Sequence, residues 1–281
     1  MNLRQSPAVQ QLVDLALSED IAAGDVTTEA TIDPEAQGAG RIVAREAGVV
    51  AGLDVAALVF EKLDPAVRFE RHVRDGDEVQ PGQPVATVSG PLRALLTGER
   101  VALNFLQHLS GVATKTRRLA ALIAHTKAKL LDTRKTTPGM RLLEKYAVRC
   151  GGGENHRMNL AEAVLLKDNH IAAVGGVAEA VRRARERAPR GLRVQVEVSS
   201  IAELEEALSA GAHAVLLDNM SLEDIRRAVE LCAGRCFVEA SGGVTEKTIV
   251  AIAEAGVDAI SCGALTHSAP ALDMSLELLP H

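Results

Sequence analysis

The chain has 281 residues, which exceeds one ordinary domain and favours either a large single barrel or two unequal domains. Hydrophobic residues make up 47% and charged residues 24%, so a disordered or collagen-like protein is excluded. Aromatic residues supply only 2% and the net charge is -6, which argues against a nucleic-acid-binding protein built on base stacking or on a polyanion-binding surface. The four cysteines include no C-x-x-C pair, and the first twenty residues contain no long apolar run. We therefore expect reduced thiols, no membrane span and a cytoplasmic location.

Basic residues are concentrated in one part of this acidic chain. Residues 100–157 contain twelve Lys or Arg and three acidic residues, whereas the remainder carries 19 basic and 34 acidic residues. Such a segment indicates a site for an anionic ligand. Arg134, Lys135 and Arg157 lie in Gly- and Thr-rich segments, where functional residues are common, so we expect them in that site. The basic residues on the neighbouring helical pattern fit a solvated helix face instead: Arg117, Arg118, Lys127 and Lys129.

Residues 1–111 predict an N-terminal α/β sandwich domain. A helix is expected from about Pro7 to Ser18, a β-prone run follows from Gly40 to Arg45, and a second helix covers Asp54 to Leu63. Residues 73–88 place D-G and P-G turns between short β-prone runs and resemble half of a biotinyl or lipoyl carrier domain. A carrier needs a Lys at a hairpin tip, and residues 68–93 contain none, so we interpret this segment as structural.

Residues 112–281 predict a (β/α) barrel, incomplete or open. Two helical segments are expected between Pro91 and His125, broken at Ser110-Gly111. Regular alternation of strand and helix follows, which indicates a parallel sheet, and the lack of G-x-G-x-x-G after the first strand favours a barrel over a dinucleotide fold. The C-terminal tail is expected to pack back on the first domain. Apolar strands are predicted near 129–132, 163–167, 193–198, 214–218, 236–240 and 258–261, and helices over 140–148, 177–187, 201–210, 221–232 and 245–255.

Each predicted strand ends in a residue that can do chemistry. The carboxyl ends of barrel strands converge on one face, so these side chains are expected to share one mouth. The last two strands are followed by the loops Ser241–Thr245 and Ser261–Leu265, whose backbone N–H groups suit a phosphate. The strand-end residues are Asp132, Lys167, Glu197, Asp218, Ser241 and Ser261.

Long, ordered motifs cover nearly the whole chain and closely resemble the quinolinate phosphoribosyltransferase family. They are Gly24–Thr28, Glu99-Arg100, Leu103-Asn104, Ser110–Thr114, Asp132–Arg141, Glu144–Val148, Gly151–Arg157, Lys167–His170, Glu197, Leu217–Asn219, Glu239–Gly243, Gly256–Asp258 and Leu265–Ser268. The resemblance implies transfer of phosphoribosyl from phosphoribosyl pyrophosphate to quinolinate, with loss of carbon dioxide and pyrophosphate, to give nicotinate mononucleotide for NAD synthesis. It also implies a homodimer, or a higher oligomer of dimers, with shared active sites.

The resemblance and the chemistry of the side chains together assign the site residues. Arg134, His156, Arg157 and Lys167 are expected at the pyridine dicarboxylate, because Arg forks match carboxylates. Arg100 is placed in the quinolinate site by the resemblance, which implies that the neighbouring subunit lends it. Glu197 and Asp218 are hard oxygen ligands suited to Mg²⁺, the one cofactor expected, and Lys167, Glu197 and Asp218 are the expected catalytic residues. The remaining residues expected to bind substrate are Thr133, Lys135, Ser241, Gly242, Gly243, Ser261 and Gly263.

Three alternatives stay open at this point. A related phosphoribosyltransferase-like enzyme would act on another substrate, such as nicotinate without decarboxylation or a compound serving molybdenum uptake. A Schiff-base aldolase would use Lys167 as its nucleophile. A carrier module in the N-terminal half would hold biotin or lipoate.

Overall fold

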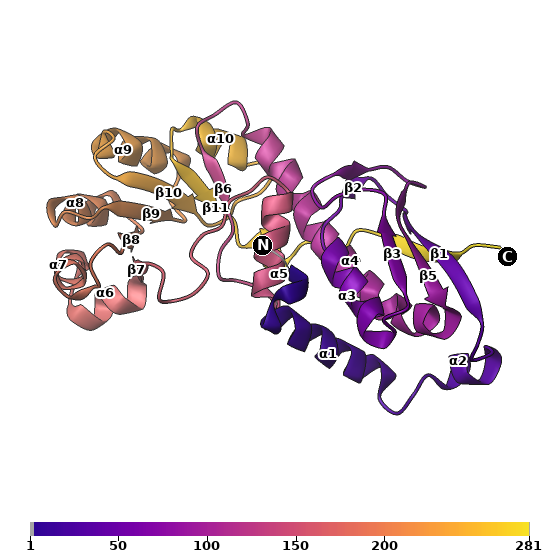
Figure 1. The fold of residues 1–281 in the computed structure, drawn as a ribbon. Helices are drawn as coiled ribbons and strands as arrows, with labels where there is room; N and C mark the ends of the chain where they lie inside the picture. The colour runs from indigo at the N-terminus through magenta and orange to yellow at the C-terminus, as the bar shows by residue number, and fades with distance from the viewer. Residues whose placement is uncertain (1–2, 281) are drawn as a thin grey trace. The chain divides into compact units, whose positions relative to one another are not determined.

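The computed structural model describes residues 3–280, so residues 1, 2 and 281 of the two predicted domains lie outside it (Figure 1). Contacts between residues divide the chain into two compact units, each of which is made of separate stretches of the sequence. The first contains the chain up to Arg117, the segment Thr137–Gly152 and the chain from Ser268 onward; the second contains Arg118–Thr136 and Gly153–His267. Within residues 3–280, no helix has both the length and the apolarity needed to cross a bilayer.

Antiparallel strands form the sheet of the first unit. Strands β1 (Gln37–Ala44), β3 (Arg68–Arg71), β5 (Pro84–Pro91) and β12 (Met274–Leu278) lie in the order β12-β1-β5-β3. Strand β12 is the last of the chain, so its pairing with β1 brings the C-terminal segment back to the N-terminal unit. A two-stranded ladder joins β2 (Gly48–Val49) to β4 (Glu78–Val79).

Helices cover this unit and supply much of its core. Helix α3 (Leu53–Leu63) buries every residue from Val55 to Phe60, as expected of the apolar run predicted for this segment. The side chain of Asp25 accepts a 3.0 Å hydrogen bond from the backbone N of Thr28 and so caps the short helix α2 (Val26–Thr31). The other helices of the unit are η1 (Leu3–Gln5), α1 (Pro7–Ile21), α4 (Leu92–Leu122) and α5 (Arg141–Cys150). Helix α4 begins in this unit and extends past its boundary at Arg117.

The predicted helix break at Ser110-Gly111 is wrong, because the 31-residue helix α4 runs through this position without interruption. Packing explains the small residues instead. The Ser110 hydroxyl accepts a 3.0 Å hydrogen bond from the backbone N of Ala51. A Cβ added to Gly111 would lie 2.0 Å from the carbonyl oxygen of Pro270, so only glycine lets this backbone approach the helix.

The second unit is built on six parallel strands in the order β6-β11-β10-β9-β8-β7. This is the strand order of a barrel, but the described residues pair no part of β6 with β7, so the sheet stays open there. The predicted open (β/α) barrel is thereby confirmed. The strands are β6 (Lys129–Leu131), β7 (Val164–Leu166), β8 (Val194–Val198), β9 (Ala214–Asp218), β10 (Phe237–Ser241) and β11 (Ala259–Ser261).

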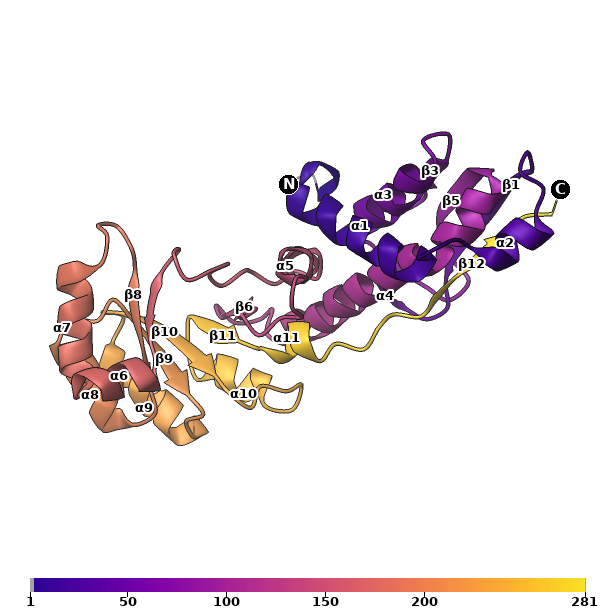
Figure 2. The same cartoon turned by 90° about the horizontal axis from the view of Figure 1, so that it is seen from below.

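Helices follow these strands along the outer side of the sheet (Figure 2). Apolar residues of the sheet, such as Val215 and Leu217, are completely buried. The helix predicted from residue 245 begins only at Ile249, because Thr245 and Thr248 hydrogen-bond each other in a preceding turn. The helices are α6 (Asp168–Val174), α7 (Val177–Arg187), α8 (Ile201–Ser209), α9 (Leu222–Cys232), α10 (Ile249–Glu254) and α11 (Ala264–His267).

Candidate active site

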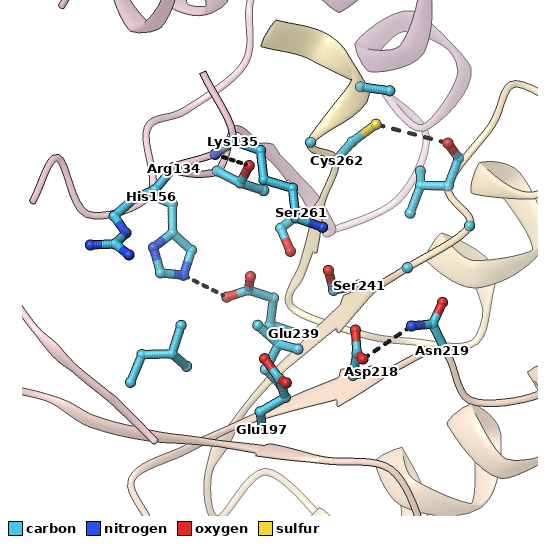
Figure 3. Close-up of a pocket in the computed structure, with 18 of the residues that line it drawn as sticks. Arg134, Lys135, His156, Glu197, Asp218, Asn219, Glu239, Ser241, Ser261 and Cys262 are labelled. Atoms are coloured by element: carbon cyan, nitrogen blue, oxygen red, sulfur yellow. Dashed lines mark hydrogen bonds and ion pairs between the residues drawn. The ribbon is translucent and has the colours of Figure 1, made fainter. Parts of the chain in front are cut away.

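A cavity of about 640 Å³ opens at the carboxyl ends of the strands of the second unit (Figure 3). Thirteen of the fourteen predicted substrate-binding residues line it. The exception is Arg100, an exposed residue of α4 in the first unit. The predicted residues at the cavity are Thr133, Arg134, Lys135, His156, Arg157, Lys167, Glu197, Asp218, Ser241, Gly242, Gly243, Ser261 and Gly263.

Strand alternation determines which residues reach the cavity. Successive side chains of a strand point to opposite faces, so Asp218 and Leu216 of β9 share one face, as do Ser241 and Glu239 of β10. All four line the cavity. The strand ends therefore form its rim, and residues two positions earlier form a deeper layer.

Cationic side chains gather on one wall. Burial lowers the pKa of the Arg157 guanidinium, and the nearby charge of Arg134 lowers it further. Both groups remain cations at neutral pH, since an Arg side chain does not deprotonate in proteins. One Arg157 nitrogen donates to the carbonyl oxygen of Ala163 at 2.7 Å, which orients the side chain. Two like charges held this close would be stabilised by a bound anion.

Carboxylates occupy the opposing strand ends. The Lys167 ammonium donates to Oε2 of Glu197 at 3.0 Å, and Nδ2 of Asn219 donates to Oδ2 of Asp218 at the same distance. The described residues contain no cluster of three or more His, Cys, Asp or Glu that could hold a metal ion. Glu197 and Asp218 are hard oxygen ligands on the adjacent strands β8 and β9, and one or two such carboxylates suit Mg²⁺ bound together with substrate oxygens.

The glycine-containing loops have conformations that side chains would obstruct. Gly242 has a φ of +92°, and a Cβ added there would lie 2.1 Å from Oδ1 of Asn219. Gly263 leaves room for the stem of Lys135, whose Cδ would lie 3.1 Å from an added Cβ. The Lys135 carbonyl in turn accepts a 2.6 Å hydrogen bond from the Thr266 hydroxyl, which ties the segment after β6 to helix α11.

One strand-end expectation is wrong. Asp132 does not line the cavity and is completely buried. Its carboxylate accepts hydrogen bonds from Nδ2 of Asn155 at 2.5 Å and from the backbone N of His156 at 2.9 Å. Asp132 therefore anchors the loop that carries His156, because a buried carboxylate is stable only when such donors surround it.

Several cavity residues were not predicted. Glu239 lies two residues before Ser241, so the period-two alternation of a strand is the signal that places it at the cavity. Asn219 is one of the few described non-glycine residues with a positive φ, at 53°, a conformation that asparagine adopts more readily than most residues. The others are Leu165, Leu216 and His267, whereas Val244, Thr245, Cys262 and Ala264 lie in the two loops expected to bind phosphate.

Comparison with known proteins identifies the family. Residues 112–277 match the model of the quinolinate phosphoribosyl transferase C-terminal domain, and residues 25–110 match the model of its N-terminal domain. The chain belongs to the quinolinate phosphoribosyltransferase family. The family resemblance seen in the sequence motifs is thereby confirmed.

Curated relatives and solved structures of this family match almost the full length. The nicotinate-nucleotide pyrophosphorylase [carboxylating] of Mycobacterium leprae (strain TN) is 43% identical over 96% of this chain and 97% of its own. The probable enzyme of the same name from Synechocystis sp. is 44% identical over 94% of this chain and 90% of its own. The structure of the nicotinate-nucleotide pyrophosphorylase from Francisella tularensis is 42% identical, covers 99% of both chains and superimposes with a TM-score of 0.93.

Proposed function

We propose that this protein is a carboxylating nicotinate-nucleotide pyrophosphorylase, which joins quinolinate to phosphoribosyl pyrophosphate in NAD biosynthesis. The products are nicotinate mononucleotide, pyrophosphate and carbon dioxide. The observation that carries the proposal is a cavity of this family's fold in which arginine and lysine side chains face two carboxylates at the ends of parallel strands. Both substrates are anions, and a polar cleft with one cationic wall favours them electrostatically.

The dicarboxylate is assigned to Arg134 and Arg157. A guanidinium presents paired N–H groups that fit a carboxylate in bidentate fashion, and quinolinate has two carboxylates to satisfy. Both arginines line the cavity, and the charge of Arg134 acts on Arg157, which supports their assignment to one ligand. Lys135 and Lys167 add cationic charge at the same cavity.

The phosphate groups of the sugar donor are assigned to the glycine-containing loops. Ser241 to Gly243 and Ser261 to Gly263 follow adjacent strands and both line the cavity. Glycine leaves the backbone N–H groups accessible, and successive N–H groups of this kind form concavities that bind anions.

The reaction needs no protein nucleophile. The pyridine nitrogen attacks C1 of the ribose as the bond from C1 to the pyrophosphate oxygen breaks. In the pyridinium so formed, the bond to the adjacent carboxylate breaks, its electron pair enters the ring and carbon dioxide leaves. A proton then replaces the lost carboxylate. The protein's task is to align the two substrates and to stabilise the separating charges.

We assign Mg²⁺ to Glu197 and Asp218. When bound, the ion neutralises charge on the departing pyrophosphate. The hydrogen bond from Asn219 orients the Asp218 carboxylate, and Lys167 does the same for Glu197. The contact between Lys167 and Glu197 also favours a fixed, protonated lysine over the Schiff-base nucleophile of an aldolase, because imine formation needs a neutral amine.

We further propose a homodimer in which Arg100 completes the partner's site. Support comes from the family resemblance and from the exposed position of Arg100 on α4, apart from the lining of the cavity. Mixing inactive Arg100→Ala and Lys167→Ala proteins under subunit exchange should restore about a quarter of wild-type activity, since half the dimers then contain one intact site. No recovery despite demonstrated exchange would remove the trans assignment. A cytoplasmic location stays a prediction from the sequence.

The direct test is incubation of the purified protein with quinolinate, phosphoribosyl pyrophosphate and Mg²⁺, with chromatographic detection of nicotinate mononucleotide and carbon dioxide. Nicotinate in place of quinolinate is the matched control, because it lacks one carboxylate. Turnover of nicotinate in preference to quinolinate would contradict the proposal and favour the related phosphoribosyltransferase, which acts on nicotinate without decarboxylation. Lys167 trapped by borohydride with a carbonyl substrate would instead support the aldolase.

A further inference from the structure

A buried acid lies in the deeper layer of the cavity, where the proposed reaction assigns it no role. Glu239 on β10 is 1% exposed. Its Oε2 accepts a 2.9 Å hydrogen bond from Nε2 of Gln195 on β8, two strands away across β9. Side chains of alternate strands meet inside a barrel, which explains why these two residues touch. The same Oε2 lies 3.5 Å from Nε2 of His156, as the dashed line of Figure 3 indicates.

The acid is held in its ionised form. Burial raises the pKa of Glu239, but its interactions with His156, Gln195 and Ser261 together outweigh this and bring the pKa below its usual value. An ionised carboxylate can only accept hydrogen bonds. The ring nitrogen of His156 that faces Glu239 must therefore carry a proton.

The other ring nitrogen of His156 is engaged as well. Its Nδ1 accepts a 2.8 Å hydrogen bond from the backbone N of Arg157. A nitrogen that accepts a hydrogen bond has no proton, so the contacts at the two ends of the ring assign the ring proton to Nε2. Glu239, His156 and Arg157 thus form a continuous chain of contacts from the deeper layer of the cavity to its cationic wall.

We propose that Glu239 is a positioning residue: it fixes the tautomer and the plane of His156, and through Nδ1 it holds the backbone of Arg157 at the cavity wall. This rests on the proposed function, because Arg157 is one of the two arginines assigned to the dicarboxylate. A carboxylate that orients a histidine is common at metal sites, where its loss typically reduces metal affinity or activity about 10- to 100-fold, and we expect an effect of the same kind here.

The test combines a spectroscopic readout with kinetics. In protein labelled with ¹⁵N-histidine, the His156 signals are found among those of the eight histidines by their loss in His156→Gln. The wild type should show a protonated Nε2 and an unprotonated Nδ1. Glu239→Gln should give a mixture of tautomers, because an amide can donate to or accept from the ring. It should also raise the KM for quinolinate roughly tenfold, while the KM for phosphoribosyl pyrophosphate changes less.

Two further variants separate positioning from folding. Gln195→Leu removes the other partner of Glu239 and should leave the His156 tautomer as in the wild type. Glu239→Asp retains a carboxylate and should keep the Nε2 proton, even if turnover falls. The inference is overturned if His156 carries its proton on Nδ1 in the wild type, or if Glu239→Gln alters neither the tautomer nor the KM for quinolinate. Because the tautomer is read without turnover, its result stands apart from a failure of the proposed reaction.

Discussion

Asn219 and Gly242 approach each other so closely at the cavity that a Cβ on Gly242 would lie 2.1 Å from Oδ1 of Asn219. The two residues follow adjacent parallel strands, and the backbone N of Asn219 donates to the carbonyl oxygen of Ser241 at 2.9 Å. Asn219 is also the residue that orients Asp218, through a 3.0 Å hydrogen bond. The loop that we assign to phosphate and the carboxylate that we assign to the metal are thus coupled through one side chain.

Gly242→Ala should therefore impair catalysis more than stability. A left-handed conformation costs an L-residue about 1–2 kcal/mol, and the same cost applies to Gly234→Ala, whose φ is +72° in open space. Only Gly242→Ala also displaces Asn219, and a shift of about 1 Å at a catalytic site can cost roughly a hundredfold in rate. We expect similar losses of unfolding free energy in both variants but a fall in kcat/KM only in Gly242→Ala. Equal kcat/KM values would show that the contact has no catalytic consequence.

Arg134→Ala should reduce kcat/KM for quinolinate severely. Loss of a charge-assisted bidentate contact costs about 2–5 kcal/mol in transition-state binding. Arg187→Ala is the matched control, since Arg187 lies exposed on α7 and does not line the cavity. Initial rates over a range of quinolinate concentrations measure the effect. A kcat/KM equal to that of the control would remove Arg134 from dicarboxylate recognition.

The sequence predicts the second unit well because its signals are local. Six apolar runs separated by helical segments suffice for a parallel sheet, and chemically active residues at their ends indicate the cavity. The continuity of α4 could not be predicted in this way. The reason for Gly111 is the backbone of Pro270, which lies more than 150 residues later in the chain.

The site itself was predicted only at its rim. Asp132 and Asp218 both end apolar strands, yet one is buried beneath a loop and the other faces the cavity. Which of the two carboxylates is buried depends on tertiary partners, because Asn155 and the backbone N of His156 both donate to Asp132. Glu239 lies two residues before Ser241 on β10, so strand alternation places it on the same face but deeper in the cavity.

Asp218→Asn should raise the Mg²⁺ concentration needed for half-maximal activity. A neutral amide is a poorer ligand for a hard cation than a carboxylate, while its size and its contact with Asn219 are nearly preserved. Glu197→Gln should act in the same direction. A titration of activity against Mg²⁺ checks both variants, with Asp168→Asn, an exposed residue outside the cavity lining, as the control. An unchanged curve for Asp218→Asn would remove that residue from the metal site but leave Glu197 in it.

Stability of the first unit should fall at alkaline pH because of Cys150. Burial and, second, the negative charge of Asp75 raise the pKa of this thiol to about 11. The unfolded thiol ionises near its ordinary pKa of 9.0, so the folded state is favoured fully below that pH. As the pH rises from 9 to about 11, ionisation stabilises the unfolded chain first, and the free energy of unfolding declines.

Tyr146 adds to the same trend, and variants separate the two residues. Burial raises the pKa of Tyr146, and so does its 2.7 Å hydrogen bond to Asp75. Cys150→Ala should make the loss of stability above pH 9 less steep, whereas Tyr146→Phe should act mainly above pH 10, where a free tyrosine ionises. Urea unfolding under reducing conditions at several alkaline pH values measures both effects. An equally steep loss of stability in Cys150→Ala and the wild type between pH 9 and 11 would contradict the prediction. It would mean that the thiol ionises as readily in the folded protein as in the unfolded chain, despite its burial beside Asp75.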